Sequence, residues 1–111
     1  MAVPFDQRPD ALWFDGKLVP TSEAKISLLT HGLHYASCVF EGERAYGGVI
    51  YKSTEHSERL KRSANILDFE IPYSVAEIDT AKRLVLENLV LHLCRPPQPE
   101  ATMWQQEELP V

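Results

Sequence analysis

The sequence predicts an α+β domain, in which a small antiparallel sheet of hairpins packs with two helices. Two turn signals, Asp15-Gly16 and Gly47-Gly48, stand between short apolar runs in the first half of the chain. Two segments with apolar residues at helical spacing follow, at 55–67 and 75–89. Because the strand signals come first and the helix signals afterwards, the pattern favours an α+β unit over a βαβ unit.

The bulk composition is that of an ordinary globular domain. The chain has 111 residues, which suits one domain, and 44% of them are hydrophobic. A formal net charge of -5 argues against nucleic acid or an anionic membrane as a partner, since both need a basic surface. No apolar run approaches the ~20 residues that cross a bilayer, and residues 1–10 lack the apolar core of a secretory signal. The two cysteines, Cys38 and Cys94, fit a reduced cytoplasmic setting better than a disulfide.

The first hairpin is predicted around Asp15-Gly16. Residues 1–10 are interpreted as a loose, proline-containing lead-in. Residues 12–14 and 17–19 are interpreted as strands, and an Asp-Gly pair between apolar segments is a strong hairpin signal. Residues 25–30 are expected to form a further extended piece.

A second hairpin is predicted around Gly47-Gly48, between residues 38–46 and residues 49–51. Strand alternation places every second side chain on the same face. One face then carries Phe40, Gly42, Arg44 and Tyr46, and the other carries Val39, Glu41, Glu43 and Ala45. A glycine within a strand weakens the hydrogen-bond ladder, so Gly42 indicates that another group approaches the backbone there.

Both predicted helices have start signals. Thr54 is placed to cap the helix at 55–67. Ser74 and Glu77 form a capping-box pattern, with a serine at the cap and a glutamate three residues later. This pattern predicts a second helix that runs to Leu89.

The last part of the chain has a different character. Residues 94–100 contain three prolines, which cannot continue a helix or occupy a central strand. Residues 101–111 show no helical or strand period. We therefore expect residues 1–90 to form the domain and residues 91–111 to be a divergent, disordered tail.

Arg59 is the first candidate for a binding role. It lies one turn beyond the predicted start of its helix, where backbone amides favour negative charge. Its planar guanidinium suits a phosphate group. The alternative is a solvated side chain paired with Glu55 one turn earlier, and the spacing alone favours that alternative.

Aromatic residues near the second hairpin suggest a pocket. Tyr35, Phe40 and Gly42 could line a site for an apolar side chain, with the Tyr35 hydroxyl as a polar contact. The alternative is that Phe40 belongs to the core, which is the commoner fate of a single aromatic residue on a strand.

His31, His34 and Cys38 have a spacing that could ligate a metal ion. Zinc needs a fourth ligand, which Cys94 or His56 could supply, but no paired motif closes the site. Structural histidines at a chain corner are the simpler interpretation, so no metal site is predicted.

The remaining charged residues give no catalytic signal. Arg44 with Glu41 or Glu43 could act as charged gatekeepers, but their opposite strand faces favour solvated side chains. None of the lysines has the apolar surroundings that lower a lysine pKa and make the amine nucleophilic. These lysines are Lys17, Lys25, Lys52, Lys61 and Lys82. No catalytic residue is predicted.

The longest motif runs from His31 to Tyr46 and continues with Glu55-His56-Ser57-Glu58-Arg59-Leu60. Together with a Trp-Phe-Asp-Gly segment at 13–16, it resembles the N-terminal small domain of the branched-chain amino acid aminotransferases. These are class IV enzymes that depend on pyridoxal phosphate. The resemblance extends over most of the chain, from about Trp13 to about Asn88, and it implies the N-terminal fold of that class.

The resemblance also implies site residues. Arg59 would hold the phosphate of the cofactor, while Phe40 and Gly42 would face the substrate side chain. Tyr35 would reach into the active site of a partner subunit, since these enzymes build each pocket across a dimer interface. Arg44 would border the pocket. The family reaction moves the amino group of leucine, isoleucine or valine to 2-oxoglutarate through a Schiff base.

The sequence departs from the family pattern in its last part. The family's Schiff-base lysine, and the acidic residue that pairs with the ring nitrogen of the cofactor, belong to a second domain outside the region of resemblance. A family Tyr-x-Arg-Pro segment corresponds here to Leu93-Cys94-Arg95-Pro96, without the tyrosine. We therefore expect a truncated aminotransferase, through a frameshift or as a gene remnant, with weak cofactor binding and no activity of its own.

Two other interpretations stay open. A separate chain could carry the large domain and complete a split enzyme. Alternatively, the protein could be a non-enzymatic interaction module, with a metal ion bound by His31, His34 and Cys38. The leading interpretation implies amino acids and 2-oxo acids as small-molecule partners. It also implies homo-oligomers or self-association through the apolar face that the second domain would cover.

Overall fold

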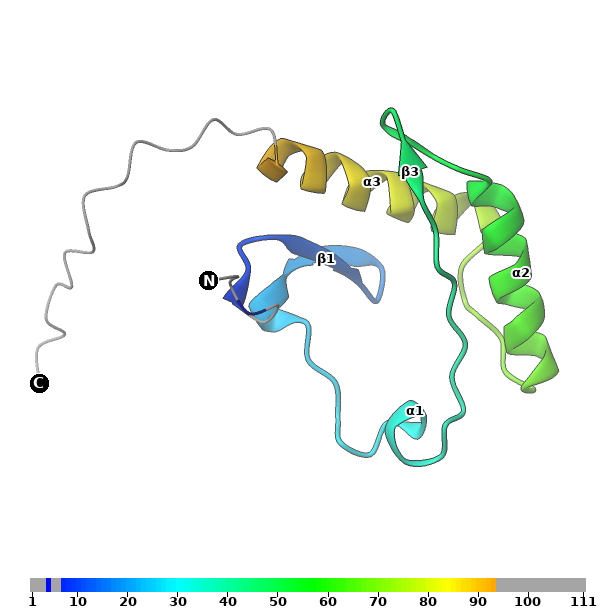
Figure 1. Ribbon diagram of the computed structural model, residues 1–111. Helices are drawn as coiled ribbons and strands as arrows, with labels where there is room; N and C mark the ends of the chain where they lie inside the picture. The colour runs from blue at the N-terminus through cyan, green and yellow to red at the C-terminus, as the bar shows by residue number, and fades with distance from the viewer. Residues whose placement is uncertain (1–3, 5–6, 94–111) are drawn as a thin grey trace, which may run out of the picture.

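The computed structural model describes Pro4 and residues 7–93. Within these residues it contains two antiparallel hairpins, two longer helices and two short helical turns (Figure 1). The expected mixture of antiparallel strands and helices is confirmed, but the strands form two separate two-stranded sheets instead of one small sheet. The expectations for Cys94, Arg95 and the rest of 94–111 lie outside the described residues.

The first hairpin forms as predicted. Strand β1 (Ala11–Phe14) pairs antiparallel with β2 (Lys17–Pro20), and Asp15 and Gly16 take φ angles of 47° and 97° in the turn. Positive φ at both central turn residues suits the right-handed twist of the paired strands, which explains the Asp-Gly pair. A 3-10 turn, η2 (Thr21–Glu23), follows directly.

The second hairpin is much shorter than predicted. Only β3 (Ala45–Tyr46) and β4 (Val49–Ile50) pair, and the two glycines between them take φ angles of 57° and 80°. The expectation of a strand is wrong for residues 38–44, because β4 offers a pairing partner to only two residues. A strand needs a neighbour for its backbone hydrogen bonds.

Residues 39–44 nevertheless keep the alternation of faces that the sequence predicts. Val39, Glu41 and Glu43 are half-buried, whereas Phe40, Gly42 and Arg44 are exposed. The face with the two carboxylates therefore turns toward the helices, and the face with the aromatic ring turns toward solvent. This orientation decides which of these residues meet.

Helix α2 (Ser53–Ile66) begins earlier than predicted. Lys52, at a φ of 52°, precedes the first turn, and no side chain caps the helix. Thr54 lies inside the helix and donates its hydroxyl hydrogen to Asp79 Oδ2 at 2.8 Å. The expectation that Thr54 caps the helix is wrong, because its hydroxyl binds the neighbouring helix instead.

Helix α3 (Val75–Leu93) has the predicted capping box at its start. The backbone N–H of Glu77 donates to Ser74 Oγ at 3.2 Å, and the backbone N–H of Ser74 donates to Glu77 Oε2 at 2.7 Å. The hydrogen bonds from Ser74 hold the pKa of the Glu77 carboxyl below its ordinary value. The helix ends at Leu93 rather than at Leu89.

Helix α2 and strand β1 pack on α3, which is the longest helix of the described part (Figure 1). Strand β1 lies along it: the backbone N–H of Ala11 donates to Asn88 Oδ1 at 3.2 Å. The rings of Trp13 and Tyr73 meet edge to face, with centroids 5.0 Å apart. Within residues 7–93 no helix is long and apolar enough to cross a bilayer.

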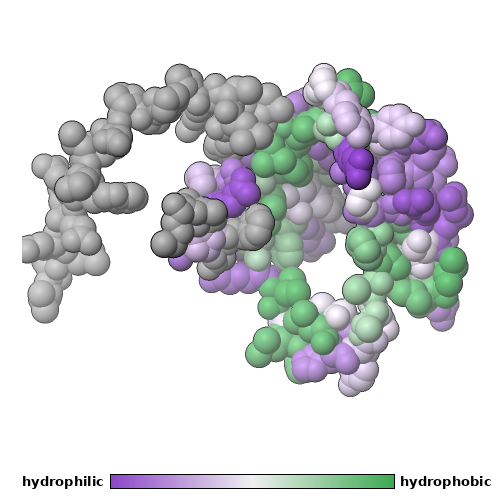
Figure 2. Space-filling model, in the orientation of Figure 1, coloured by the Kyte–Doolittle hydropathy of each residue, from purple (hydrophilic) through white to green (hydrophobic). Residues whose placement is uncertain are grey.

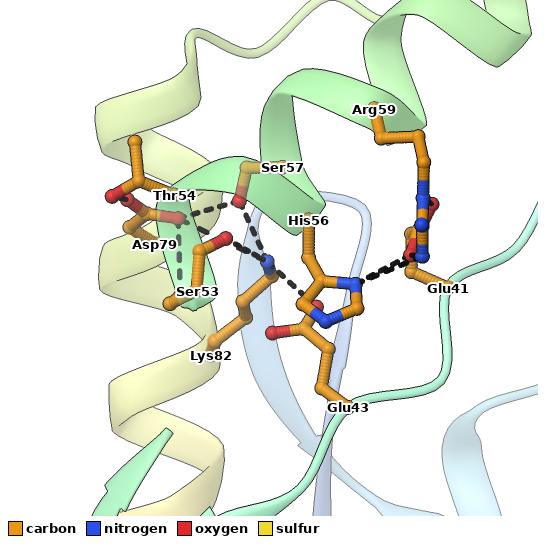
Figure 3. Close-up of polar contacts among 9 residues, drawn as sticks. All are labelled: Glu41, Glu43, Ser53, Thr54, His56, Ser57, Arg59, Asp79 and Lys82. Atoms are coloured by element: carbon orange, nitrogen blue, oxygen red, sulfur yellow. Dashed lines mark hydrogen bonds and ion pairs between the residues drawn. The ribbon is translucent and has the colours of Figure 1, made fainter. Parts of the chain in front are cut away.

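A polar network joins α2 to α3 (Figure 3). Ser57 of α2 is fully buried and donates to Asp79 Oδ1 of α3 at 2.5 Å. The ammonium of Lys82 donates to Ser57 Oγ at 2.6 Å and to Ser53 O at 3.0 Å, and it pairs with Glu43 Oε1 at 2.7 Å. An ammonium has three N–H donors, so these contacts use all of them. The network therefore fixes both the helix pair and residue 43.

The Asp79 carboxylate is stabilised in its charged form. Partial burial raises the pKa of Asp79, but the hydroxyls of Ser57, Thr54 and Ser53 and the ammonium of Lys82 outweigh burial. The net result is a pKa below the ordinary value of 3.8. Folding therefore favours the ionised carboxylate, and the contact strengthens the folded state only while Asp79 is charged.

Residues 24–44 form a long arm between the two hairpins, with α1 (His31–His34) at its far end (Figure 1). The predicted extended piece at 25–30 pairs with no strand within the described residues. Large apolar side chains of this arm are exposed; they are Ile26, Leu28, Leu29, Leu33, Tyr35 and Phe40. Figure 2 shows hydrophobic surface over this apolar arm. The described residues leave it uncovered.

Replacing Ser57 by alanine tests the polar network. Ser57→Ala removes one acceptor of Lys82 and one donor to Asp79 at a fully buried position, so we expect a loss of about 1–3 kcal/mol in the free energy of unfolding. Urea denaturation followed by circular dichroism measures it. Ser63→Ala is the matched control, on the same helix and half-buried. Equal losses in the two variants would contradict a special role for the network.

The depressed pKa of Asp79 predicts the direction of a pH effect. Because the folded pKa lies below the unfolded one, the contribution is complete above about pH 3.8 and disappears as the pH falls through the folded pKa. We expect Asp79→Asn to be less stable than the parent at pH 6, with a smaller difference at pH 2.5. Thermal unfolding at the two pH values gives the comparison. A difference that stays constant or grows in acid would show that the charge of Asp79 does not matter.

Candidate functional site

The best-defined ionic cluster contains Glu41, His56 and Arg59 (Figure 3). Arg59 Nε donates to Glu41 Oε1 at 2.7 Å, and Arg59 Nη2 donates to Glu41 Oε2 at 2.6 Å. His56 Nδ1 lies 2.6 Å from Glu41 Oε2. An ionised carboxylate only accepts hydrogen bonds, so Nδ1 carries the proton. The cluster joins the segment before β3 to helix α2.

The charges in this cluster reinforce one another. The hydrogen bonds from Arg59 and His56 lower the pKa of Glu41 from its ordinary value of 4.5 to about 2, against the opposing effect of burial. The hydrogen bond with Glu41 and its negative charge raise the pKa of Arg59 above its ordinary value. Both side chains are therefore charged throughout the physiological pH range.

A small hollow lies along the same face of α2. Its volume is about 250 Å³, and it is lined by Lys52, Glu55, His56, Arg59 and Arg62. Going along the sequence, neighbouring members of this set are separated by three, one, three and three positions. This spacing places them on one face of a helix. Three cationic side chains face one carboxylate in the lining, so the hollow suits an anion. We call it the basic hollow.

The sequence predicted two alternatives for Arg59, a phosphate-binding group or a solvated partner of Glu55. The contacts of Arg59 differ in part from both. Its expected partner in the solvated alternative, Glu55, makes no ion pair with it within the described residues, and Glu41 takes that place. A bidentate contact with Glu41 uses Nε and Nη2 only. The guanidinium keeps further N–H donors on Nη1 and Nη2, and Arg59 is 58% exposed at its side chain. The residue is therefore both ordered and able to bind another anion.

The other sequence-predicted site residues are not brought together with Arg59. Tyr35 is 71% exposed and Phe40 is 85% exposed, both on the apolar arm, so the alternative that places Phe40 in the core is wrong. A side chain at Gly42 would meet nothing within 4 Å. Arg44 lies elsewhere, in the lining of a second cavity.

This second cavity has a volume of about 520 Å³ and lies against α3. Apolar side chains from β1, β4, α2 and α3 line most of it; among them are Trp13, Ile50, Leu60, Ile78 and Val85. Glu43 and Lys82 stand at its polar end, and Glu43 Oε2 is buried without a hydrogen-bond partner in the described part. The cavity is thus an apolar groove with one acceptor left open.

No group of three or more metal-ligating side chains gathers among residues 7–93. His31 and His34 instead lie beside the ring of Tyr35, with ring centroids 5.1 Å and 6.5 Å away. Cys38 is free and exposed. The described residues therefore give no support to the interpretation as a metal-binding module.

Two residues that the sequence predicted to be solvated take part in ion pairs instead. Glu41 and Glu43 are expected as solvated side chains, but their side chains are only 8% and 16% exposed. That expectation is wrong because Arg59 and Lys82 reach them from the two helices. The available signal was the period of two along 39–43, since it places both carboxylates on one face with the half-buried Val39.

Comparison with known proteins identifies relatives of part of the chain. Over 76 residues it is 50% identical to the probable branched-chain-amino-acid aminotransferase of Rickettsia bellii and 53% identical to that of Rickettsia felis. It is 45% identical over 80 residues to the branched-chain-amino-acid aminotransferase of Pseudomonas aeruginosa. No family model matches the chain.

Each of these alignments covers 68% of this chain and 26% of the relative. The chain therefore spans about a quarter of the length of the curated relatives that it matches. The aligned residues lie in its N-terminal part. Through these residues, the chain belongs to the branched-chain-amino-acid aminotransferase family, of which it represents an N-terminal portion.

Proposed function

We propose that this chain carries the phosphate-binding portion of a branched-chain amino acid aminotransferase small domain, of the class IV fold. The cofactor of the proposed enzyme is pyridoxal phosphate. Its reaction is the transfer of the amino group of leucine, isoleucine or valine to 2-oxoglutarate. When bound, the cofactor would supply an aldehyde that exchanges amino groups and an electron-withdrawing ring attached to it. The residues of this chain contribute binding and orientation.

The observation that carries this proposal is the placement of Arg59 in the basic hollow. The guanidinium has an ordered position, an exposed edge and two further cations, Lys52 and Arg62, along the same lining. A phosphate monoester is a compact dianion with three acceptor oxygens, which suits such a group of donors. The residues present therefore fit the phosphate of the cofactor.

The substrate-facing roles belong to the proposal as well. Phe40 and Gly42 would face the substrate side chain, Arg44 would border the pocket, and Tyr35 would contribute to the site of a partner subunit. All four are exposed, so each is available to a surface that approaches the arm. The exposed ring of Phe40 supplies apolar area, and Gly42 leaves room beside it.

Replacing Arg59 tests the phosphate site. Pyridoxine 5′-phosphate and pyridoxine differ by the phosphate and carry no aldehyde that could react with a lysine. We expect the phosphate ester to bind the parent protein more tightly, and Arg59→Ala to reduce that preference by about tenfold, because a charge-assisted hydrogen bond is lost. Isothermal titration calorimetry measures both ligands.

Arg83→Ala is the matched control for this experiment. Arg83 lies on α3 and donates to Thr80 Oγ1, outside the basic hollow. The Arg83→Ala substitution removes the same charge from the protein but leaves the proposed contact between Arg59 and the phosphate in place. An equal loss of phosphate preference in both variants, or no preference in the parent, would contradict the proposed function.

We also propose that the apolar arm associates with a second copy of this chain. Its exposed leucines and aromatic rings all fall within residues 26–40, and large exposed apolar patches mark interaction surfaces. Leu29→Glu is expected to shift the protein toward monomer in sedimentation equilibrium. Ile66→Glu is the control, because Ile66 is as exposed as Leu29 (82% and 81%) but lies at the end of α2. Identical behaviour of the two variants would argue against association through the arm.

A further inference from the structure

The guanidinium of Arg59 has two edges that can each bind an anion, and only one of them is occupied. The side edge, formed by Nε and Nη2, is taken by the two oxygens of Glu41. The end edge, formed by Nη1 and Nη2, retains one N–H from each nitrogen; His56 Nδ1 lies 3.2 Å from Nη2 but carries its own proton and does not accept one. A second anion can therefore bind Arg59 without displacing the first.

Of the two partners, Glu41 is the fixed one. Its side chain is 8% exposed, whereas that of Arg59 is 58% exposed. Glu41 is also bound by His56 Nδ1 at 2.6 Å, so its carboxylate keeps its position independently of Arg59. A long, exposed arginine loses much side-chain entropy when it is held in one rotamer. The buried carboxylate provides the contact that holds it.

We propose that Glu41 is a positioning residue, which holds the side edge of Arg59 so that the end edge is presented to a phosphate monoester in the basic hollow. This inference rests on the proposed function, since it takes the hollow as the phosphate site. Glu41 does not touch the ligand. It acts through Arg59, by removing the cost of ordering the guanidinium when the phosphate binds.

The charge of Glu41 alone would have the opposite effect. A carboxylate next to the site partly cancels the positive charge of Arg59 and repels a phosphate dianion. If charge were the main contribution, removing it would strengthen phosphate binding. If positioning is the main contribution, removing the contact weakens phosphate binding. The sign of the change therefore separates the two roles.

Three variants give the decisive series. Glu41→Gln removes the charge and keeps one oxygen that can accept from Arg59, whereas Glu41→Ala removes the charge and both acceptors. Glu58→Gln removes the same charge from the residue that precedes Arg59 in the sequence, whose side chain is exposed. The probes are pyridoxine 5′-phosphate and pyridoxine, and the readout is the ratio of their dissociation constants. This ratio cancels a general effect on folding.

We expect the phosphate preference to fall in the order parent, Glu41→Gln, Glu41→Ala, with a total loss of roughly 3–10-fold, the effect of one immobilised long side chain. The order should persist in 1 M salt, where the Coulomb effect of a removed charge is largely screened. Glu58→Gln should keep the parent preference or exceed it slightly. Equal or higher phosphate preference in both Glu41 variants overturns the inference.

The outcome also separates this inference from the proposed function. If the parent prefers the phosphate ester and Arg59→Ala reduces the preference as expected, the phosphate site stands, and the Glu41 series decides on positioning alone. If the parent shows no preference, both fall. A second measurement needs no ligand: the Nε–H signal of Arg59 in a nitrogen-15 NMR spectrum should be resolved in the parent and broadened by exchange in Glu41→Ala. An unchanged signal overturns the inference.

Discussion

The interactions on which the candidate site depends are the ion pairs of Glu41 and Glu43 with the two long helices. Glu41 binds Arg59 and His56 of α2, and Glu43 binds Lys82 of α3. The segment has no strand partner, so its backbone contributes no sheet hydrogen bonds there. Charge-assisted side-chain contacts replace them.

This attachment explains the orientation of the neighbouring side chains. In an extended segment, alternate residues face opposite ways, so turning both carboxylates inward turns Phe40, Gly42 and Arg44 outward. The same attachment orders Arg59 beside the basic hollow. One arrangement thus produces both the phosphate site of our proposal and the exposure of Phe40 on the apolar arm.

Local signals predicted the local structure well. The Asp15-Gly16 turn, the capping box of Ser74 and Glu77 and the amphipathic pattern of both helices appear as expected. Each of these depends on residues within a few positions of one another, where backbone geometry and capping decide the conformation. The resemblance to the aminotransferase family, carried by a motif of adjacent residues, is also confirmed.

Features that depend on distant residues were missed. Thr54 has the chemistry of a cap, but Asp79, 25 residues later, takes its hydroxyl instead. Residues 39–44 have the alternation predicted for a strand, yet within residues 7–93 they belong to neither sheet. The partner of Arg59 is Glu41 rather than Glu55, because the side chain at 41 is brought to α2 by tertiary structure. The periodicity of a sequence predicts which side chains share a face of a helix or strand, but it does not predict which groups that face contacts.

The most direct test of the central claim is a crystal structure of the protein with pyridoxine 5′-phosphate. The phosphate oxygens should lie within hydrogen-bond distance of Nη1 and Nη2 of Arg59, while Glu41 keeps both of its present contacts with Nε and Nη2. A phosphate that displaces Glu41 from the side edge of Arg59, or one that binds away from Arg59, would contradict it.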